Sequence, residues 1–310
     1  MDQTAKEHWP VMVKEVIEAL NIQANGIYLD ATYGRGGHSQ AILKQLGEKG
    51  QLWVMDQDPQ AISHAKTLAK KEARLHIFHG NFSKIDHMLE NNNLKGKIDG
   101  ILIDLGVSSP QLDQAQRGFS FMHEGDLDMR FDPNIGQSAA QWLNAATEED
   151  IADVLYYYGE ERSSRRIAAA IIKARNLSSI QKTTELAQII RDAIPHKAYA
   201  RKHPATKSFL AIRLFINQEL ESLRDFLPKA EASLNSHGRL VTLSFHSLED
   251  RLIKRFMQGP GRYGDEHHIT PPVYNQQMKR LRLNKKPSRI EILANPRSRS
   301  TILRAAEKQG

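Results

Sequence analysis

The chain has 310 residues, of which 40% are hydrophobic and 25% are charged, and it contains no cysteine. This composition is typical of a globular protein with a sizeable core, and the lack of cysteine excludes a disulfide framework, a thiolate nucleophile and a zinc ribbon. No run approaches the roughly eighteen apolar residues of a membrane span, and the first residues do not resemble a signal peptide. We therefore expect a cytoplasmic protein without a membrane partner.

The net charge of +7 is unevenly distributed along the chain. Residues 239–310 contain 15 Lys and Arg against 6 Asp and Glu, whereas the rest of the chain is slightly acidic. A basic excess of this size favours a polyanionic partner, most simply nucleic acid. A solvated basic surface is the alternative, and charge alone does not decide between the two.

The first third of the chain alternates between helical and strand-like patterns. The spacing of apolar residues over 13–20 predicts an amphipathic helix. Four short apolar runs predict strands, at residues 26–30, 51–56, 74–78 and 97–104. Strands alternating with helices predict a parallel, doubly wound α/β sheet, in which ligands bind beyond the carboxyl ends of the strands. Asp30, Asp56 and Asp104 would all lie there.

The pattern changes in the middle of the chain. Residues 113–137 are rich in Gly, Asp and Phe without periodicity, so we expect a long loop. Only helices are predicted after it, at residues 138–175, 183–194 and 205–234. The stretch TEED at 147–150 predicts a capping box at the start of one helix. We therefore expect an all-helical domain, residues 113–213, inserted into a discontinuous α/β domain, residues 1–112 and 214–310.

The α/β pattern resumes in the C-terminal quarter of the chain. A strand is predicted at 238–245 and a helix at 247–257, where Ser247 is a suitable N-cap. Residues 258–287 carry four prolines and three glycines and predict a loop. A last strand is expected around 300–304.

A glycine-rich loop, GRGGHS at 34–39, follows the first predicted strand. It departs from the dinucleotide fingerprint at the third glycine, and it lacks the Gly-Lys-Ser/Thr of a P-loop. Asp56 ends the second strand, where a carboxylate can accept hydrogen bonds from ribose hydroxyls. Phe82 follows the third strand and could pack on a purine, with core packing as the alternative. Together these residues predict an adenosyl ligand and leave S-adenosylmethionine and NAD both open.

Six segments, in this order from about residue 9 to residue 304, resemble the signature segments of a known family. They are DATYGRGGHS (30–39), DLGVSSPQLD (104–113), RGFSF (117–121), HPATKSF (203–209), SFHSLEDR (244–251) and NPRSRSTILR (295–304). Through these six segments the chain resembles the small-subunit ribosomal RNA cytosine-N4 methyltransferases. The resemblance implies a Rossmann-like methyltransferase sheet interrupted by a helical domain that recognises the substrate.

The same resemblance implies the reaction and its participants. The cofactor would be S-adenosylmethionine, and the methyl acceptor the exocyclic N4 of a cytidine in the decoding region of 16S rRNA. The partner would be that RNA within the small ribosomal subunit, and a homodimer is left open. The positions implied to bind the cofactor are Gly36, Gly37, His38, Asp56, Phe82, Asp104 and Gln111.

The chemistry gives Asp104 a possible second role. The cytosine amine is a poor nucleophile, and an acceptor for its hydrogen bonds would turn a lone pair toward the methyl group. Other amino-methyltransferases carry an Asp/Asn/Ser-Pro-Pro-aromatic stretch at this place, whereas this chain has DLGV at 104–107. We therefore expect Asp104 to act either as the amine acceptor or only in cofactor binding. The ring that stacks on the base would come from elsewhere, with Phe119, Phe121 and Phe245 as candidates.

Histidine and arginine residues complete the candidate site. His246 could act as a general base toward the RNA substrate, or it could be a buried, hydrogen-bonded histidine. No histidines fall at metal-ligand spacing with carboxylates, so we expect no metal. A phosphate track is predicted from the basic quarter and from the end of the helical insert. Its members would be Arg297, Arg299, Arg304, Arg282, Lys285 and Lys286, with Lys197, Arg201, Lys202 and Lys207 as a second cluster.

Two other functions compete with this interpretation. An NAD-dependent dehydrogenase on the same fold would need the third fingerprint glycine and a site for hydride transfer, and neither is evident. A non-catalytic RNA-binding factor for ribosome assembly could retain the same fold. Cofactor binding would test the first alternative, and methyl transfer would test the second.

Overall fold

A computed structural model describes residues 10–194, 203–259, 273–283 and 286–310 of the chain. The chain divides into two compact units. The α/β unit contains the residues up to Gly106 together with Leu220–Gly310, and the helical unit contains Val107–Glu219. The helical unit is thus wider at both ends than the expected 113–213.

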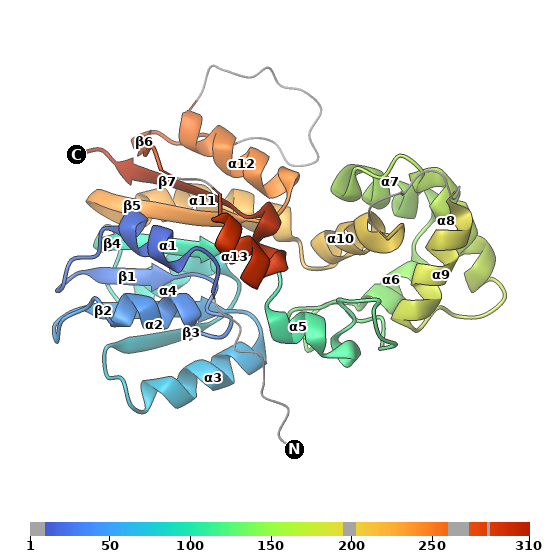
Figure 1. Cartoon of the computed structure of the whole chain (residues 1–310), viewed down its shortest axis with the longest axis horizontal. Coiled ribbons are helices and arrows are strands. Elements are labelled where there is room, and N and C mark those ends of the chain that lie inside the picture. Colours follow the sequence, from blue (N-terminus) through green and yellow to red (C-terminus); the bar gives the residue numbers. More distant parts are fainter. Residues whose placement is uncertain (1–9, 195–202, 260–272, 284–285) are drawn as a thin grey trace. The chain divides into compact units, whose positions relative to one another are not determined.

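A seven-stranded sheet forms the centre of the α/β unit (Figure 1). In spatial order its strands are β3 (Leu75–His79), β2 (Gln51–Asp56), β1 (Ile27–Asp30), β4 (Ile98–Asp104), β5 (Leu234–Ser244), β7 (Ile302–Lys308) and β6 (Met278–Arg280). Neighbouring strands from β3 to β5 are parallel, and β7 runs antiparallel to both β5 and β6. The predicted α/β sheet is confirmed, but β6 lies inside the segment that we expected to be a loop.

The strand order reverses direction at β1. Strands β2 and β3 lie on one side of it, and β4 and β5 lie on the other. In doubly wound sheets, ligands bind outside the carboxyl ends of the strands at such a point. Asp30 ends β1 and pairs in register with Leu102, two residues before Asp104 ends β4. The two carboxylates therefore belong to the part of the sheet where a ligand is expected.

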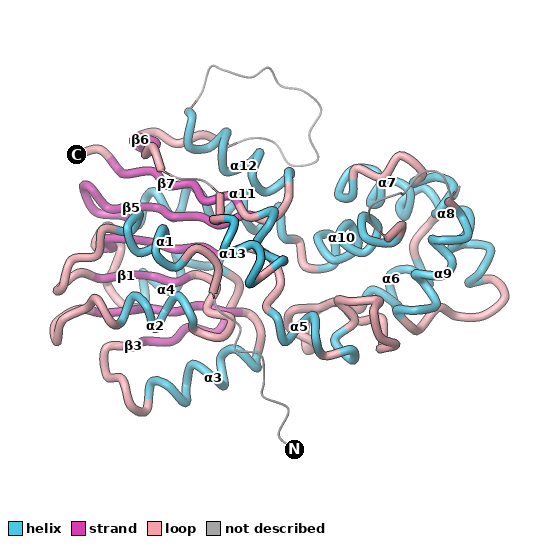
Figure 2. Tube along the Cα trace, viewed as in Figure 1, coloured by secondary structure: helices cyan, strands magenta, loops and turns pink. Residues whose placement is uncertain are grey.

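Helices lie on both faces of this sheet (Figure 2). They are α1 (Val13–Leu20), α2 (Gly37–Leu43), α3 (Pro59–Ala69), α4 (Ile85–Asn91), α11 (Glu219–Ser233), α12 (Ser247–Gln258) and α13 (Arg289–Ala294). In α1, the predicted apolar stripe buries Val16, Ala19 and Leu20 in the core. The same core includes Leu102 of β4 and Val241 of β5, so α1 is fixed against the centre of the sheet.

The helical unit has its own apolar core. Its helices are α5 (Ser109–Asp113), α6 (Ala139–Ala145), α7 (Glu148–Gly159), α8 (Ser164–Arg175), α9 (Thr183–Ala193) and α10 (Ala205–Ile216). Leu143, Leu155 and Ile167 are fully buried in this core. The predicted capping box is present at the start of α7, where Thr147 Oγ1 accepts from the Asp150 amide at 3.1 Å. Within the described ranges, no helix is both long and apolar enough to cross a membrane.

Candidate active site

Asp30 ties the end of β1 to the start of α2. Its side chain is buried, and Oδ2 accepts a hydrogen bond from Ser39 Oγ at 2.6 Å. Oδ1 accepts from the Thr32 amide at 3.2 Å. Burial raises the pKa of Asp30, although the bond from Ser39 acts in the opposite direction. Asp30 is therefore a structural group that shapes the glycine-rich loop.

The glycines of this loop make room for other parts of the α/β unit. Gly36 has a φ of +73°, and a Cβ added there would lie 2.6 Å from Tyr33 Oη. A Cβ on Gly37 would lie 2.7 Å from Cγ of Pro10. Any side chain at these positions would displace its neighbours, so internal packing already requires glycine at both. The cofactor contacts expected of Gly36 and Gly37 stay a prediction.

Asp56, at the end of β2, holds the same loop from the other side. Its Oδ2 accepts from the Gly34 amide at 2.8 Å, and its Oδ1 accepts from the Asp58 amide at 2.8 Å. Burial raises the pKa of Asp56 to about 6. Each carboxylate oxygen has two lone pairs, so both oxygens keep the capacity to accept one more hydrogen bond. Asp56 is thus able to accept hydrogen bonds from a ribose while it supports the loop.

The buried His38 and the partly exposed Asp104 form a polar pair at the point where the strand order reverses. His38 is 5% exposed, and its Nε2 lies 3.5 Å from Asp104 Oδ2. Neither ring nitrogen of His38 nor Oδ1 of Asp104 has a hydrogen-bond partner in the described part of the chain. Buried polar atoms are normally hydrogen-bonded. These three atoms are therefore suited to bind a polar ligand at the carboxyl ends of β1 and β4.

The electrostatics of this pair favour a charged histidine. Burial lowers the pKa of His38, but the nearby carboxylate of Asp104 raises it. Asp30 and Glu291 add to the increase, and the net result is a raised pKa. The backbone also positions Asp104, since its amide donates to Thr32 Oγ1 at 2.7 Å. A protonated His38 would hold one carboxylate oxygen of Asp104 and leave the other for a ligand.

Phe82 is placed by the structure in the core of the α/β unit. The residue is 8% exposed, and its ring packs edge-on against Phe226 with centroids 5.3 Å apart. The structure therefore shows Phe82 packed in the core, which was one of the two alternatives for this residue. A contact between this ring and an adenine stays a prediction.

Three of the predicted site residues belong to the helical unit. Gln111 closes a capping box at the start of α5, where its Oε1 accepts from the Ser108 amide at 2.8 Å. Phe119 is 7% exposed and stacks on Phe131 within the core. Its ring also lies beside the guanidinium of Arg117, 5.7 Å from the ring centroid, and its stacking on a base stays a prediction. Phe121 is half-buried and stacks on His203, with centroids 4.5 Å apart.

Phe245, the third candidate ring, belongs to the same unit as Asp104. It follows β5 directly, and a Cβ added to Gly106 would lie 3.4 Å from its Cδ2. Gly106 is two residues beyond Asp104 and has a φ of +96°, which favours glycine. The partly exposed ring of Phe245 therefore lies next to the end of β4.

His246 begins α12, which corrects our placement of the N-cap at Ser247. Its Nδ1 accepts from the Glu249 amide at 3.5 Å, and its Nε2 lies 3.0 Å from Glu249 Oε1. Glu249 is buried and also accepts from the Phe245 amide through Oε2 at 2.9 Å. The structure thus supports a partly buried histidine that caps a helix. Sequence reasoning missed Glu249, because no local pattern connects it with Phe245.

The residues of the predicted phosphate track differ in exposure and in their contacts. Arg304 is buried and forms a bidentate pair with Asp250, with N–O distances of 2.6 and 2.8 Å. Its guanidinium is used inside the fold, and its contact with RNA stays a prediction. Arg297 and Arg299 are exposed on the short helix Pro296–Ser300. Of the other predicted cations, Arg282 and Lys286 are exposed, and Lys207 donates to the Glu160 carbonyl. The remaining four, Lys197, Arg201, Lys202 and Lys285, lie outside the described residues.

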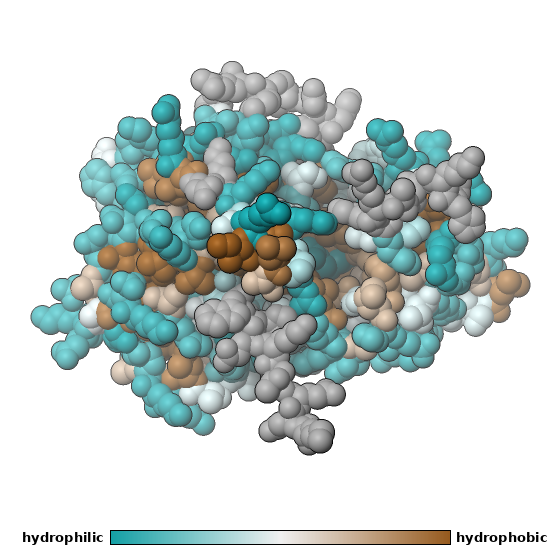
Figure 3. Space-filling model, viewed as in Figure 1, coloured by the Kyte–Doolittle hydropathy of each residue, from teal (hydrophilic) through white to brown (hydrophobic). Residues whose placement is uncertain are grey.

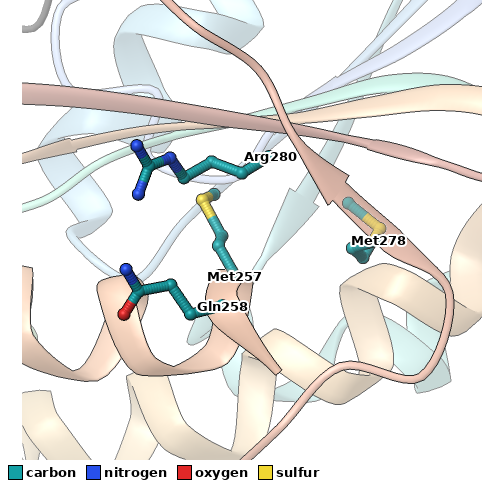
Figure 4. Close-up of a pocket in the computed structure, with 4 residues that line it drawn as sticks. All are labelled: Met257, Gln258, Met278 and Arg280. Carbon is teal, nitrogen blue, oxygen red and sulfur yellow. The ribbon is translucent and has the colours of Figure 1, made fainter. Parts of the chain in front are cut away.

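A pocket in the α/β unit lies away from the predicted site. Figure 4 shows that it is lined by Met257 and Gln258, at the end of α12, and by Met278 and Arg280 of β6. Strand β6 is at the edge of the sheet, separated from β4 by β5 and β7. The pocket is therefore not part of the arrangement around Asp104. Across the ranges described, no group of three His, Cys, Asp or Glu residues could hold a metal ion.

Comparisons with known proteins show the family. Residues 5–309 match the family described as the MraW methylase family. A protein of Pseudoalteromonas atlantica named "Ribosomal RNA small subunit methyltransferase H" is 50% identical over 310 residues, which cover 98% of this chain and 99% of the relative.

Similarity to solved structures is weak. A putative rRNA methylase from Clostridium thermocellum has a TM-score of 0.43 at 11% identity, with 93% of this chain and 90% of that chain covered. A putative methyltransferase from Streptococcus mutans, in complex with SAH, has a TM-score of 0.41 at 10% identity, with 96% and 94% covered. The sequence matches over nearly the full length establish that the chain belongs to the MraW methylase family, which confirms the resemblance of its six signature segments.

Proposed function

We propose that the protein transfers a methyl group from S-adenosylmethionine to the exocyclic N4 of a cytidine in the decoding region of 16S rRNA. The substrate would be the RNA within the small ribosomal subunit, in the cytoplasm. One observation carries this proposal: a carboxylate oxygen of Asp104 without a partner, at the carboxyl end of β4 and beside His38. Membership of a methylase family, and the name of its relative, support the class of reaction and of substrate.

The residues around Asp104 fit this cofactor. S-adenosylmethionine carries positive charge on its sulfonium and amino groups, and Asp56 and Asp104 supply negative charge at the ends of β2 and β4, the two strands on either side of β1. When bound, the cofactor supplies an electrophilic methyl group. Asp56 would accept hydrogen bonds from the ribose. The remaining predicted cofactor contacts are Gly36, Gly37, His38, Phe82 and Gln111.

Asp104 would orient the amine of the target base. Its free Oδ1 would accept an N–H of the cytosine amine, so that the nitrogen lone pair points at the methyl group. The N–C bond forms as the S–C bond breaks, and the amine then loses one proton to Asp104 or to water. Holding the reacting atoms in line can account for roughly 7–11 kcal/mol of the barrier. His38, through its contact with Oδ2, would fix the direction of the carboxylate.

Each unit carries residues that are suited to contact RNA. In the α/β unit, Phe245 is suited to stack on the base, and the exposed Arg297 and Arg299 are suited to contact phosphates. We assign methyl transfer to residues 1–112 and 214–310, and substrate recognition to the helical insert, 113–213. In this assignment the half-buried Phe121 is the second candidate for a base contact.

Substitution of Asp104 tests the proposed role of its carboxylate. At saturating cofactor, Asp104→Asn should slow single-turnover transfer by about 10- to 100-fold, because a hydrogen bond to a charged acceptor is replaced by a weaker one. Cofactor affinity is measured by calorimetry and transfer by rapid quench. Asp225→Asn, an exposed carboxylate on α11, is the matched control. Unchanged turnover in Asp104→Asn would leave Asp104 with cofactor binding alone.

A further inference from the structure

Two large apolar side chains protrude from the α/β unit on the short helix α13. Ile290 is 81% exposed and Leu293 is 74% exposed. They are three residues apart in a helix, so they share one face. Figure 3 shows an apolar patch over α13, with hydrophilic surface directly above it in this view. The other large apolar side chains with this degree of exposure among the described residues belong to the helical unit.

The helix that presents them is held firmly at its start. Ser288 caps it by accepting from the Glu291 amide at 3.1 Å. Glu291 Oε1 in turn accepts from the Met12 amide at 2.5 Å. After the helix, Ser298 is fully buried and donates through Oγ to the Asn295 carbonyl at 2.7 Å. The exposed pair is therefore carried on an anchored support.

The anchor also places α13 beside the candidate active site. Met12, which contacts Glu291, is two residues from Pro10, and Pro10 packs against Gly37. The charge of Glu291 is near enough to His38 to contribute to the increase in its pKa. Helix α13, which carries Ile290 and Leu293, thus belongs to the same unit as Asp104 and lies near the glycine-rich loop.

The charges around the exposed pair favour an RNA partner. Over residues 286–300 the chain carries Lys286, Arg289, Arg297 and Arg299 against one acid, Glu291. All four cations are exposed, whereas Glu291 is partly buried and bonded to Met12. An apolar pair within such a cationic surface matches the stacked bases and phosphates of a nucleic acid.

We propose that Ile290 and Leu293 form a wedge that inserts between RNA bases beside the target cytidine and helps it to leave its stack. This inference rests on the proposed function. Enzymes that modify a base extrude it into the active site, and apolar side chains inserted between base steps are a known way to unstack them. Arg297 and Arg299 would hold the phosphates on either side of the opened step.

The test uses the double variant Ile290→Ser/Leu293→Ser of the full-length protein. Its substrates are small subunits lacking the modification and reconstituted with 2-aminopurine next to the target cytidine. The wild type should raise the fluorescence of this base as it unstacks, and the double variant should not. Methyl transfer by the double variant should fall by on the order of tenfold or more, with S-adenosylmethionine affinity unchanged.

Two control variants separate a wedge from a general effect on the surface. Ile290→Met/Leu293→Met keeps the apolar volume and should behave as wild type. Leu177→Ser removes an apolar side chain that is 85% exposed in the helical unit and should also behave as wild type. On subunits in which the neighbouring nucleotide is abasic, no base has to be unstacked, so transfer by the serine variant should recover.

Each contrary result has a distinct meaning. Equal fluorescence and equal transfer for the wild type and the serine variant would overturn the wedge. An equal loss on the abasic substrate would show a general RNA contact, and a changed molecular mass of the serine variant in solution would show an interface between copies of the chain. The fluorescence change does not require transfer. It therefore tests the wedge even if the wild type transfers no methyl group, a result that would contradict only the proposed function.

Discussion

Lowering the pH through 6 should weaken the binding of S-adenosylmethionine by protonating Asp56. Burial raises the pKa of this carboxyl to about 6, and its ionised form accepts the Gly34 and Asp58 amides while it keeps lone pairs for a ribose. If only the ionised form binds the cofactor, the dissociation constant exceeds that of the fully ionised protein by about 1.1-fold at pH 7 and by about elevenfold at pH 5. The expected loss of affinity between these two values is therefore about tenfold.

The stability of the cofactor-free protein should respond to Asp56 in the opposite direction. The pKa in the folded state exceeds the ordinary aspartate pKa of 3.8, so the folded protein binds this proton more tightly than the unfolded chain does. The resulting stabilisation is complete below about 3.8 and is lost as the pH rises through about 6. Acidification should thus strengthen this contribution to folding while it weakens cofactor binding.

Calorimetric titrations at pH 5, 6, 7 and 8 measure the affinity. Asp56→Asn should bind the cofactor more weakly at pH 8 and show no step near pH 6. His38 is the other group near the site with a raised pKa, so His38→Asn is the control and should retain the step. The reasoning fails if wild-type affinity is the same at pH 5 and pH 7, or if Asp56→Asn keeps the tenfold decrease.

Three further substitutions test the structural roles assigned above. Arg304→Ala should lower the free energy of unfolding in urea by about 3–5 kcal/mol, because it leaves the carboxylate of Asp250 without its buried partner; a change in the salt dependence of RNA binding without loss of stability would support its phosphate role. Phe119→Ala should cost about 3–5 kcal/mol in the same assay through a cavity in the helical core, whereas little loss would show that the ring is not packed there. His246→Ala should cost about 1 kcal/mol and His246→Asn much less, since asparagine also caps helices. A large decrease in the single-turnover rate of His246→Asn, at unchanged stability, would support a general base instead.

The sequence predicts those parts of the fold that depend on local pattern. Strands β1 to β4 are short apolar runs, and their acidic ends and the alternating helices are enough to predict a parallel sheet with a ligand at its carboxyl edge. Strand β6 and helix α13 were missed, because they are short and lie among prolines, glycines and charges without periodicity. The N-cap of α12 was misplaced by one residue, since serine is the stronger capping residue whereas His246 takes that position here.

The roles of several site residues depend on partners that are distant in the chain. Arg304 meets a carboxylate 54 residues away, so its use in a buried pair leaves no local signal. Phe82 packs against Phe226, and no sequence pattern near Phe82 distinguishes a core ring from a ring that faces a ligand. The sequence shows that Gly36 and Gly37 lie in a glycine-rich loop, but the close approach of Tyr33 and Pro10 to them appears only in three dimensions.

Methyl transfer from labelled S-adenosylmethionine to small ribosomal subunits that lack the modification is the most direct test of the proposed function. The label should enter the RNA of the subunit, and nucleoside mass analysis should recover N4-methylcytidine from the decoding region. Asp104→Asn should give the same product more slowly. Cofactor binding without any methylated nucleoside, on subunits and on naked RNA alike, would contradict methyl transfer and favour a role in ribosome assembly.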